Sequence, residues 1–214
     1  MLLSSTYRTS SHPSDRSKEI DPQNRWLQHT NVKRLEAEVI RDTVLTVSGS
    51  LNRTLGGPGI APFITQYQHG RGKPKSGPLN GNGRRSIYLQ VRRNFIPPMF
   101  LAFDYPLPIS TIGRRSISTV PSQALMMMNN EFVGREAELW ASRLIEQKGT
   151  PRERIRTMFQ TAFGRSPDEP EMRYARSFLD NQKSEYVVFH ENDPRILADL
   201  ANVLFNSTEF IFVQ

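Results

Sequence analysis

The sequence predicts a mainly α protein, in which an irregular N-terminal half with one long helix and one or two short strands precedes a C-terminal helical bundle. Three observations predict this fold class. Apolar residues recur at helical spacing through most of residues 122–214. Residues 1–121 are rich in Arg, Pro and Gly and show such spacing only near residues 32–48. The 214 residues include no cysteine, so no disulfide framework holds the irregular half.

The first half begins with a loop. Residues 1–30 are rich in Ser, Thr and Arg and predict little regular structure. From Val32 the pattern changes, because Ile40 and Val44 begin an apolar stripe and Gly49 supplies a stop. We therefore expect a helix over residues 32–48.

The rest of this half is dominated by turn residues. Residues 52–83 contain Gly and Pro clusters and two Asn-Gly steps. A connection this long without periodicity is typical of a functional loop or a mobile insertion. The β-branched and aromatic content of residues 86–91 predicts a short strand, which Pro97 and Pro98 prevent from continuing. Residues 96–121 contain five prolines and predict extended chain with turns.

The second half contains five predicted helices. Ser122 is expected to cap a short helix through Met128, and an apolar stripe over residues 133–144 predicts the next. Thr150, with Glu153 three residues later, forms a capping box for a third helix that ends at Gly164. Two Xaa-Pro steps start the fourth and fifth helices, Ser166-Pro167 and Asp193-Pro194, and Pro170 is a possible cause of delay in the first full turn of the fourth. Helices that carry apolar stripes and are joined by such short connections should pack as a small bundle. We expect 1–121 and 122–214 to form one continuous domain.

Arginine dominates the positive charge of the chain. The net charge is +7, and there are 22 Arg but only 6 Lys. A guanidinium offers five donors in a fixed fork that suits carboxylates, phosphates and buried carbonyls. One interpretation is an anion-binding face for nucleic acid, an acidic polymer or a lipid headgroup. The other, which we favour, is that arginines fix loops that lack secondary structure.

Several classes of site find no support in the residues. Without cysteine there is no thiol nucleophile, thiolate metal site or covalent haem attachment. No phosphate-binding loop or nucleophile elbow is found, nor a signal peptide or a stretch long enough to span a membrane. The four histidines are isolated in sequence: His12, His29, His69 and His190. We therefore predict no metal site, no cofactor and no catalytic residue.

Four carboxylates lie near the irregular regions: Glu36, Asp42, Asp104 and Glu131. Two carboxylates that hydrolyse a glycoside must lie about 5–9.5 Å apart. Sequence spacing alone does not reveal such a pair, and most carboxylates are expected to be solvated or paired with one of the many arginines.

One constellation stands out from the rest. The pentapeptide Gly-Arg-Arg-Ser-Ile at 83–87 recurs at 113–117, with another arginine pair between the copies. In functional terms, such arginines would clamp a polyanion, a carboxylate-bearing sugar or a haem propionate. In structural terms, they would bond backbone carbonyls left free by a Pro-rich chain. No recognised nucleic-acid-binding motif surrounds them, so nucleic acid is an unlikely partner. The candidate anion- or partner-binding residues are Arg84, Arg85, Arg92, Arg93, Arg114 and Arg115.

These motifs resemble a known family in their order along the chain. The motifs are Arg-Arg-Ser-Ile-Tyr-Leu at 84–89, Arg93-Asn94, Phe103-Asp104, Gly113-Arg114-Arg115, Gln123-Ala124-Leu125 and the flanking Asp21-Pro22-Gln23-Asn24-Arg25, Gly164-Arg165-Ser166-Pro167 and Asn206-Ser207-Thr208-Glu209-Phe210. With these residues the chain is similar to the planctomycete-specific C-terminal domain of unknown function, which lies downstream of a cytochrome-c-like domain in large planctomycete proteins.

The resemblance implies context rather than chemistry, because the family has no established activity. It implies an exported, cell-envelope setting, and possible partners are an upstream haem-bearing or planctomycete-specific domain supplied by another chain and an anionic polysaccharide. Ser5-Thr6-Tyr7-Arg8 normally lies well inside the domain, so the chain resembles its C-terminal two-thirds and we expect a truncated N-terminus.

Two functional hypotheses follow. The leading one is a non-catalytic interaction or scaffold domain whose arginine segment contacts a partner domain or an anionic ligand. The alternative is a fragment of an enzyme that acts on polysaccharide, with Glu36 or Asp104 as acid or base.

Overall fold

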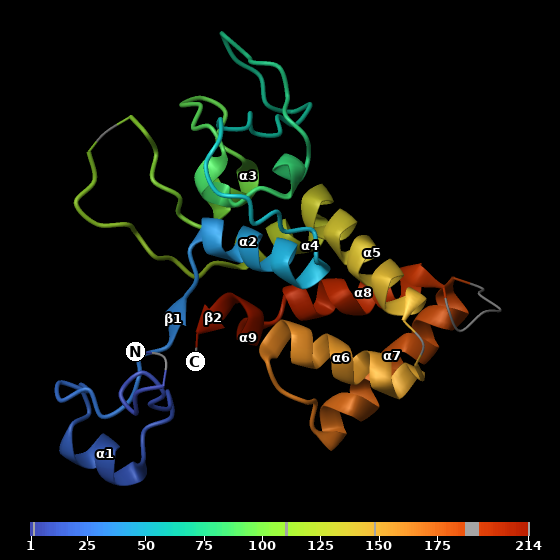
Figure 1. Ribbon diagram of the computed structural model, residues 1–214. Helices are drawn as coiled ribbons and strands as arrows, with labels where there is room; N and C mark the ends of the chain where they lie inside the picture. Colours follow the sequence, from blue (N-terminus) through green and yellow to red (C-terminus); the bar gives the residue numbers. More distant parts are fainter. Residues whose placement is uncertain (2, 110, 148, 187–192, 214) are drawn as a thin grey trace.

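The computed structural model describes residues 1, 3–109, 111–147, 149–186 and 193–213 and has the predicted mainly α architecture (Figure 1). A two-stranded antiparallel sheet, β1 with β2, accompanies the helices. In chain order the elements are α1 (Asp15–Ile20), β1 (Lys33–Arg34), α2 (Ala37–Ser48), the 3₁₀ turns η1 (Gly81–Gly83) and η2 (Ser86–Tyr88), α3 (Pro98–Ala102), α4 (Pro121–Asn129), α5 (Glu131–Glu146), α6 (Pro151–Phe163), α7 (Glu169–Glu185), α8 (Pro194–Phe205), α9 (Thr208–Ile211) and β2 (Phe212–Val213).

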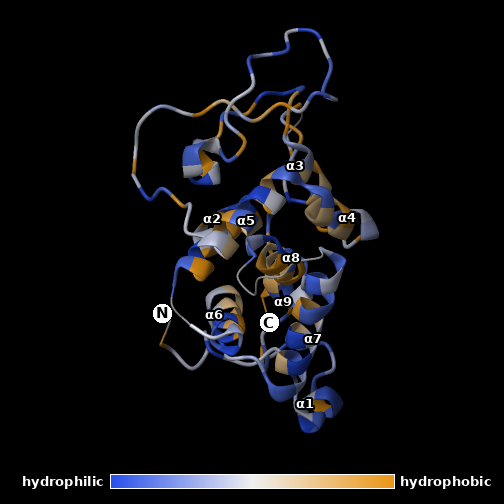
Figure 2. Ribbon diagram, turned by 90° about the vertical axis from the view of Figure 1, so that its right-hand side faces the viewer, coloured by the Kyte–Doolittle hydropathy of each residue, from blue (hydrophilic) through white to orange (hydrophobic). Residues whose placement is uncertain are grey.

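Helices α5 and α8 form the centre of the bundle. They make the most extensive contact between any two elements described, and Trp140 of α5 stacks on Phe205 of α8 with ring centroids 5.4 Å apart. Helix α8 is coloured largely hydrophobic in Figure 2, as expected of a helix surrounded by others. Helix α2 packs on α5, so the long helix of the irregular half shares its core with the bundle.

The helix ends of the bundle follow the capping rules. Thr150 and Glu153 form the predicted capping box of α6, and Gly164 ends that helix in the left-handed conformation. Two predicted starts are wrong. Helix α4 begins at Pro121 rather than after a Ser122 cap, and α7 begins at Glu169 because Asp168, with Glu171, forms a second capping box.

The irregular half needs three corrections. The helix predicted over 32–48 starts only at Ala37, because residues 33–34 pair with 212–213 as strands. The strand predicted over 86–91 is wrong: its first three residues form a 3₁₀ turn, which Asp42 holds by accepting hydrogen bonds from the Ser86 backbone N–H and hydroxyl. Helices α1 and α3 arise where only loop and extended chain were expected.

Residues 3–31 form a small lobe beside the main body (Figure 1). Among the described residues of this lobe, those buried are the polar Asp21 and Asn24. The Asp21 carboxylate accepts a hydrogen bond from the Trp26 N–H at 2.8 Å, and the Asn24 amide donates to the His29 carbonyl at 2.7 Å. The lobe is therefore held by local polar contacts, and the Trp26 side chain is left exposed.

Candidate anion-binding surface and its arginine anchors

Arg41 fastens the irregular chain to α2. Its side chain is buried and donates to the carbonyls of Asn80 at 2.7 Å and Arg84 at 3.0 Å. It also donates to the Ser86 hydroxyl at 3.0 Å. Burial lowers the pKa of the Arg41 guanidinium, and the charges of Asp42 and Glu136 oppose that shift. One side chain thus bonds two carbonyls and a hydroxyl of the irregular segment 80–86.

Glu136 extends this network into the bundle. It lies in the middle of α5 and is fully buried. Its carboxylate accepts a short hydrogen bond from the Ser48 hydroxyl and a longer one from the Asn80 amide at 3.3 Å. Sequence reasoning missed Glu136. The available signal was its position three residues after Val133 and four before Trp140, on the apolar face of the predicted helix.

Arg34 fastens the connection between α3 and α4. Its guanidinium is buried and donates to the Ser118 carbonyl at 2.7 Å and to the Asp104 carboxylate at 2.9 Å. The Asp104 carboxylate also accepts from the Ser118 N–H at 2.7 Å. Burial would raise the pKa of Asp104, but the hydrogen bonds from Ser118 and Arg34 outweigh it, and the pKa falls below its ordinary value. The ion pair between Arg34 and Asp104 thereby holds the two ends of the 104–118 loop together.

This pKa shift predicts how stability depends on pH. Because the folded-state pKa of Asp104 is depressed, its contribution is complete above the ordinary value of 3.8 and is lost as the pH falls through the lower folded-state value. We expect Asp104→Asn to be less stable than the wild type at pH 7 by about 1–3 kcal/mol, since the hydrogen bonds to a charged acceptor are lost. Urea unfolding at pH 7 and pH 3 should show this difference shrinking in acid. An equal difference at both pH values would contradict the assignment.

The second arginine of each Gly-Arg-Arg-Ser-Ile copy pairs with the same helix. Arg85 lies 3.7 Å from the Asp42 carboxylate. Arg115 makes a two-pronged pair with Glu38 at 2.8 and 2.9 Å and also contacts Glu36 at 3.1 Å. Glu38 and Asp42 are one turn apart on α2, so the two copies attach to neighbouring positions of one helix.

The first arginines of the two copies differ. The Arg84 guanidinium lies 4.0 Å from the Tyr88 ring centroid and donates to the Gly56 carbonyl. Arg114 is exposed and has no hydrogen bond or ion pair with the described part of the chain. Between the copies, Arg92 donates only to the neutral Gln90 side chain, and Arg93 is exposed without a partner among the described residues. The predicted set thus divides into three arginines that bond other segments of the chain (Arg84, Arg85 and Arg115) and three that make no such contact among the described residues (Arg92, Arg93 and Arg114).

The candidate carboxylates do not come together as a free pair. Asp42 and Asp104 lie in the two arginine networks, and Glu36 contacts Arg115. Glu131, at the start of α5, is exposed beside a cavity. Within the described residues no three His, Asp or Glu side chains are grouped to hold a metal ion, and His190 lies outside those residues. No helix in the described ranges has the length and apolarity needed to cross a membrane.

Charge is distributed very unevenly along the chain. Residues 43–103 contain eight Lys and Arg and no acid, so the formal charge of this stretch is more positive than the net charge of +7 of the whole protein. Among the described residues, Arg85 is the one member of the eight with an ion pair. Six others are exposed on the loops of the irregular half: Arg53, Arg71, Lys73, Lys75, Arg92 and Arg93.

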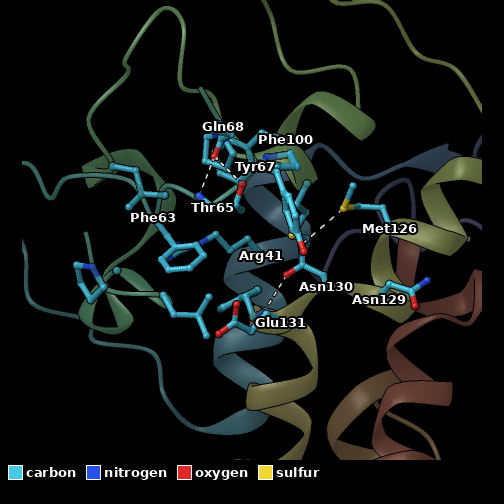
Figure 3. A pocket seen from close by; sticks show the side chains of 18 of the residues that line it. Arg41, Phe63, Thr65, Tyr67, Gln68, Phe100, Met126, Asn129, Asn130 and Glu131 are labelled. Atoms are coloured by element: carbon cyan, nitrogen blue, oxygen red, sulfur yellow. Dashed lines mark hydrogen bonds between the residues drawn. The ribbon is translucent and has the colours of Figure 1, made fainter. Parts of the chain in front are cut away.

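A cavity of about 700 Å³ lies between these loops and the bundle (Figure 3). Its walls come from residues 63–68, from the start of α3, and from the junction of α4 with α5. Most of the lining is apolar, and Figure 3 shows Tyr67 and Phe100 on one side, with Glu131 across the cavity from them. The exposed ring of Tyr67 is available at the rim.

Together, the fold and the site define a mainly α domain whose irregular half is fastened by buried arginines and presents unpaired cations beside an apolar cavity. The chain belongs to the PSD1 family, proteins of unknown function (DUF1553), whose pattern matches residues 1–179. The matched range includes the whole irregular half and the bundle as far as α7. No curated protein shows significant similarity to the chain. No solved structure shows significant similarity to the chain either.

Proposed function

We propose that this protein is a non-catalytic interaction domain that binds an anionic partner through the loops of residues 43–103. The observation that carries the proposal is the acid-free stretch of 61 residues with its exposed, unpaired cations. Cations left without carboxylate partners create a positive potential that attracts anions and raises the association rate. Arginine adds planar, forked donors that suit carboxylates and phosphates.

The buried arginines support the non-catalytic part of the proposal. Arg34 and Arg41 donate their hydrogen bonds to carbonyls and neighbouring side chains. These arginines therefore hold the loops in place rather than contact a ligand. The alternative, a polysaccharide-acting enzyme, needs a carboxylate that can hold and release a proton. Glu36 and Asp104 both contact arginines, and the depressed pKa of Asp104 makes it a weak proton acceptor near neutral pH.

The proposal includes the context that the sequence resemblance implies. In it, residues 1–121 and 122–214 act as one continuous domain of a cell-envelope protein of planctomycete type. An upstream haem-bearing domain on another chain, or an anionic polysaccharide, is the candidate partner. The packing of α2 on α5 supports joint action of the two portions, because the cationic loops are tied to α2 and α2 shares the bundle core.

Salt dependence tests the proposal. We expect the chain to bind fluorescein-labelled poly-L-glutamate and polygalacturonate, and the logarithm of the binding constant to fall steeply and linearly with the logarithm of NaCl concentration, as for other multi-ion contacts. Fluorescence anisotropy between about 20 and 200 mM NaCl, a span across which screening strengthens markedly, measures the slope. Absence of binding to both polymers at the lowest salt would refute the proposed function.

A further inference from the structure

We propose that the cavity of about 700 Å³ receives a bulky apolar side chain from an acidic protein segment, so that the anionic partner is a protein. This inference rests on the proposed function and narrows the class of its partner. It rests on three properties of the site: apolar walls, cations on loops that adjoin one wall, and a volume within the range of ligand pockets.

The walls favour an apolar occupant. Apolar side chains from both portions of the chain line the cavity, among them Phe63, Leu79, Leu89, Phe100, Met126 and Phe132. The one buried cation on the wall, Arg41, already donates to two carbonyls and a hydroxyl. Hydroxyl groups of a polysaccharide would lose water against the apolar part of these walls, whereas an aromatic or aliphatic side chain loses little there.

The unpaired cations lie beside one wall. The Gln68 amide, on the cavity wall, donates to the Ile96 carbonyl at 3.0 Å, and Gly70 lies against the Phe95 ring. These contacts hold the 68–71 loop alongside residues 92–96. Arg71 is therefore on a loop that adjoins the one with Arg92 and Arg93.

The opposite wall carries the opposite charge. Glu131 lies across the cavity from Gln68 and Tyr67 (Figure 3) and has no ion pair with the described residues. Acidic residues of a bound segment would be attracted to the arginine side and repelled from Glu131. The charges thus orient a segment in which an apolar side chain enters the cavity and its acidic neighbours remain on the side of Arg92 and Arg93.

The size and the rim complete the fit. Ligand pockets commonly have roughly 300–1,000 Å³, and this cavity lies within that range. Tyr67 is 80% exposed at the rim, where a second aromatic ring can pack against it. A tyrosine in this position contributes little to folding, so it is available for contact with a partner.

Two labelled peptides of equal length and charge test the inference: acidic peptides with a central Phe or a central Ala. By anisotropy in about 150 mM NaCl, we expect the Phe peptide to bind about tenfold more tightly, the effect of burying one aromatic side chain. Tyr67→Ala should reduce this preference several-fold without changing the melting temperature. Tyr174→Ala is the matched control, because Tyr174 is 77% exposed on α7, away from the cavity lining. Met126→Trp, which adds a bulky ring to the cavity wall, should weaken the preference.

The outcomes separate this inference from the proposed function. Equal binding of the two peptides would overturn the cavity assignment and leave anion binding intact. Binding of neither peptide and of neither polyanion would refute both. A single-stranded oligonucleotide of equal charge that binds more tightly than the Phe peptide in the same buffer would assign the surface to nucleic acid and overturn the protein partner.

Discussion

Arg41→Met should lower the free energy of unfolding by about 3–5 kcal/mol, the usual cost of removing one partner from a buried charge network. The methionine fills much of the space of the side chain, so the loss comes from the hydrogen bonds. The Asn80 and Arg84 carbonyls and the Ser86 hydroxyl would lose the hydrogen bonds that Arg41 donates, and Asp42 and Glu136 would lose a nearby cation. Guanidinium unfolding followed by circular dichroism measures the change.

The control for this variant is an exposed arginine on the same bundle. Arg135 pairs with Glu138 on the surface of α5, and both side chains are more than half exposed. Arg135→Met should therefore change stability by less than about 1 kcal/mol. A similarly small loss for Arg41→Met would show that the 80–86 segment is not fastened through this residue and would contradict the anchor role.

Gly83→Ala should be strongly destabilising, whereas Gly113→Ala, at the equivalent position of the repeat, should be nearly neutral. Gly83 has φ +69°, and a β-carbon there would lie 2.1 Å from the Ser50 carbonyl oxygen. The left-handed conformation alone costs a non-glycine residue about 1–2 kcal/mol, and the backbone contact adds to that cost. Gly113 has open space around it within the described chain.

Thermal unfolding of both alanine variants checks this pair. We expect a clear drop in melting temperature for the first and little change for the second. The Gly83 backbone also matters for the network, because the Asn52 N–H donates to the Gly83 carbonyl at 2.8 Å. Equal melting temperatures for the two variants would mean that the first copy of the repeat is not held tightly against residues 50–52.

The helical bundle was predictable because its signals are local. Apolar spacing and caps such as Thr150 with Glu153 depend on residues within one or two turns. The same reasoning misplaced the start of α7, where Asp168 competes successfully with Ser166 for the cap position because Glu171 completes its capping box. Such errors shift an element by a few residues and leave its packing face unchanged.

The irregular half was less predictable because distant contacts determine it. Residues 86–91 have the composition of a strand, yet Asp42, 44 residues away from Ser86, holds a 3₁₀ turn there. The strand that did form at Lys33–Arg34 requires Phe212–Val213 at the other end of the chain. Neither contact has a signature within a short window of sequence.

The candidate site was predicted only in part. The repeat drew attention to the six arginines, and the structural interpretation applies to Arg84, Arg85 and Arg115. The buried anchors Arg34 and Arg41 were not distinguished, since a lone arginine in a sequence does not reveal which carbonyls surround it. The cavity likewise depends on segments far apart in sequence, and no local pattern predicts it.

The central claim is that the unpaired cations bind the partner while the buried arginines hold the fold, and one measurement tests it directly. Binding of labelled poly-L-glutamate should be compared between Arg71→Ala/Arg92→Ala/Arg93→Ala and the control Arg173→Ala/Arg176→Ala, whose arginines are exposed on α7. We predict at least about tenfold weaker binding and a shallower salt slope for the triple variant, with an unchanged melting temperature. Equal affinities for the triple variant and the control would contradict the account.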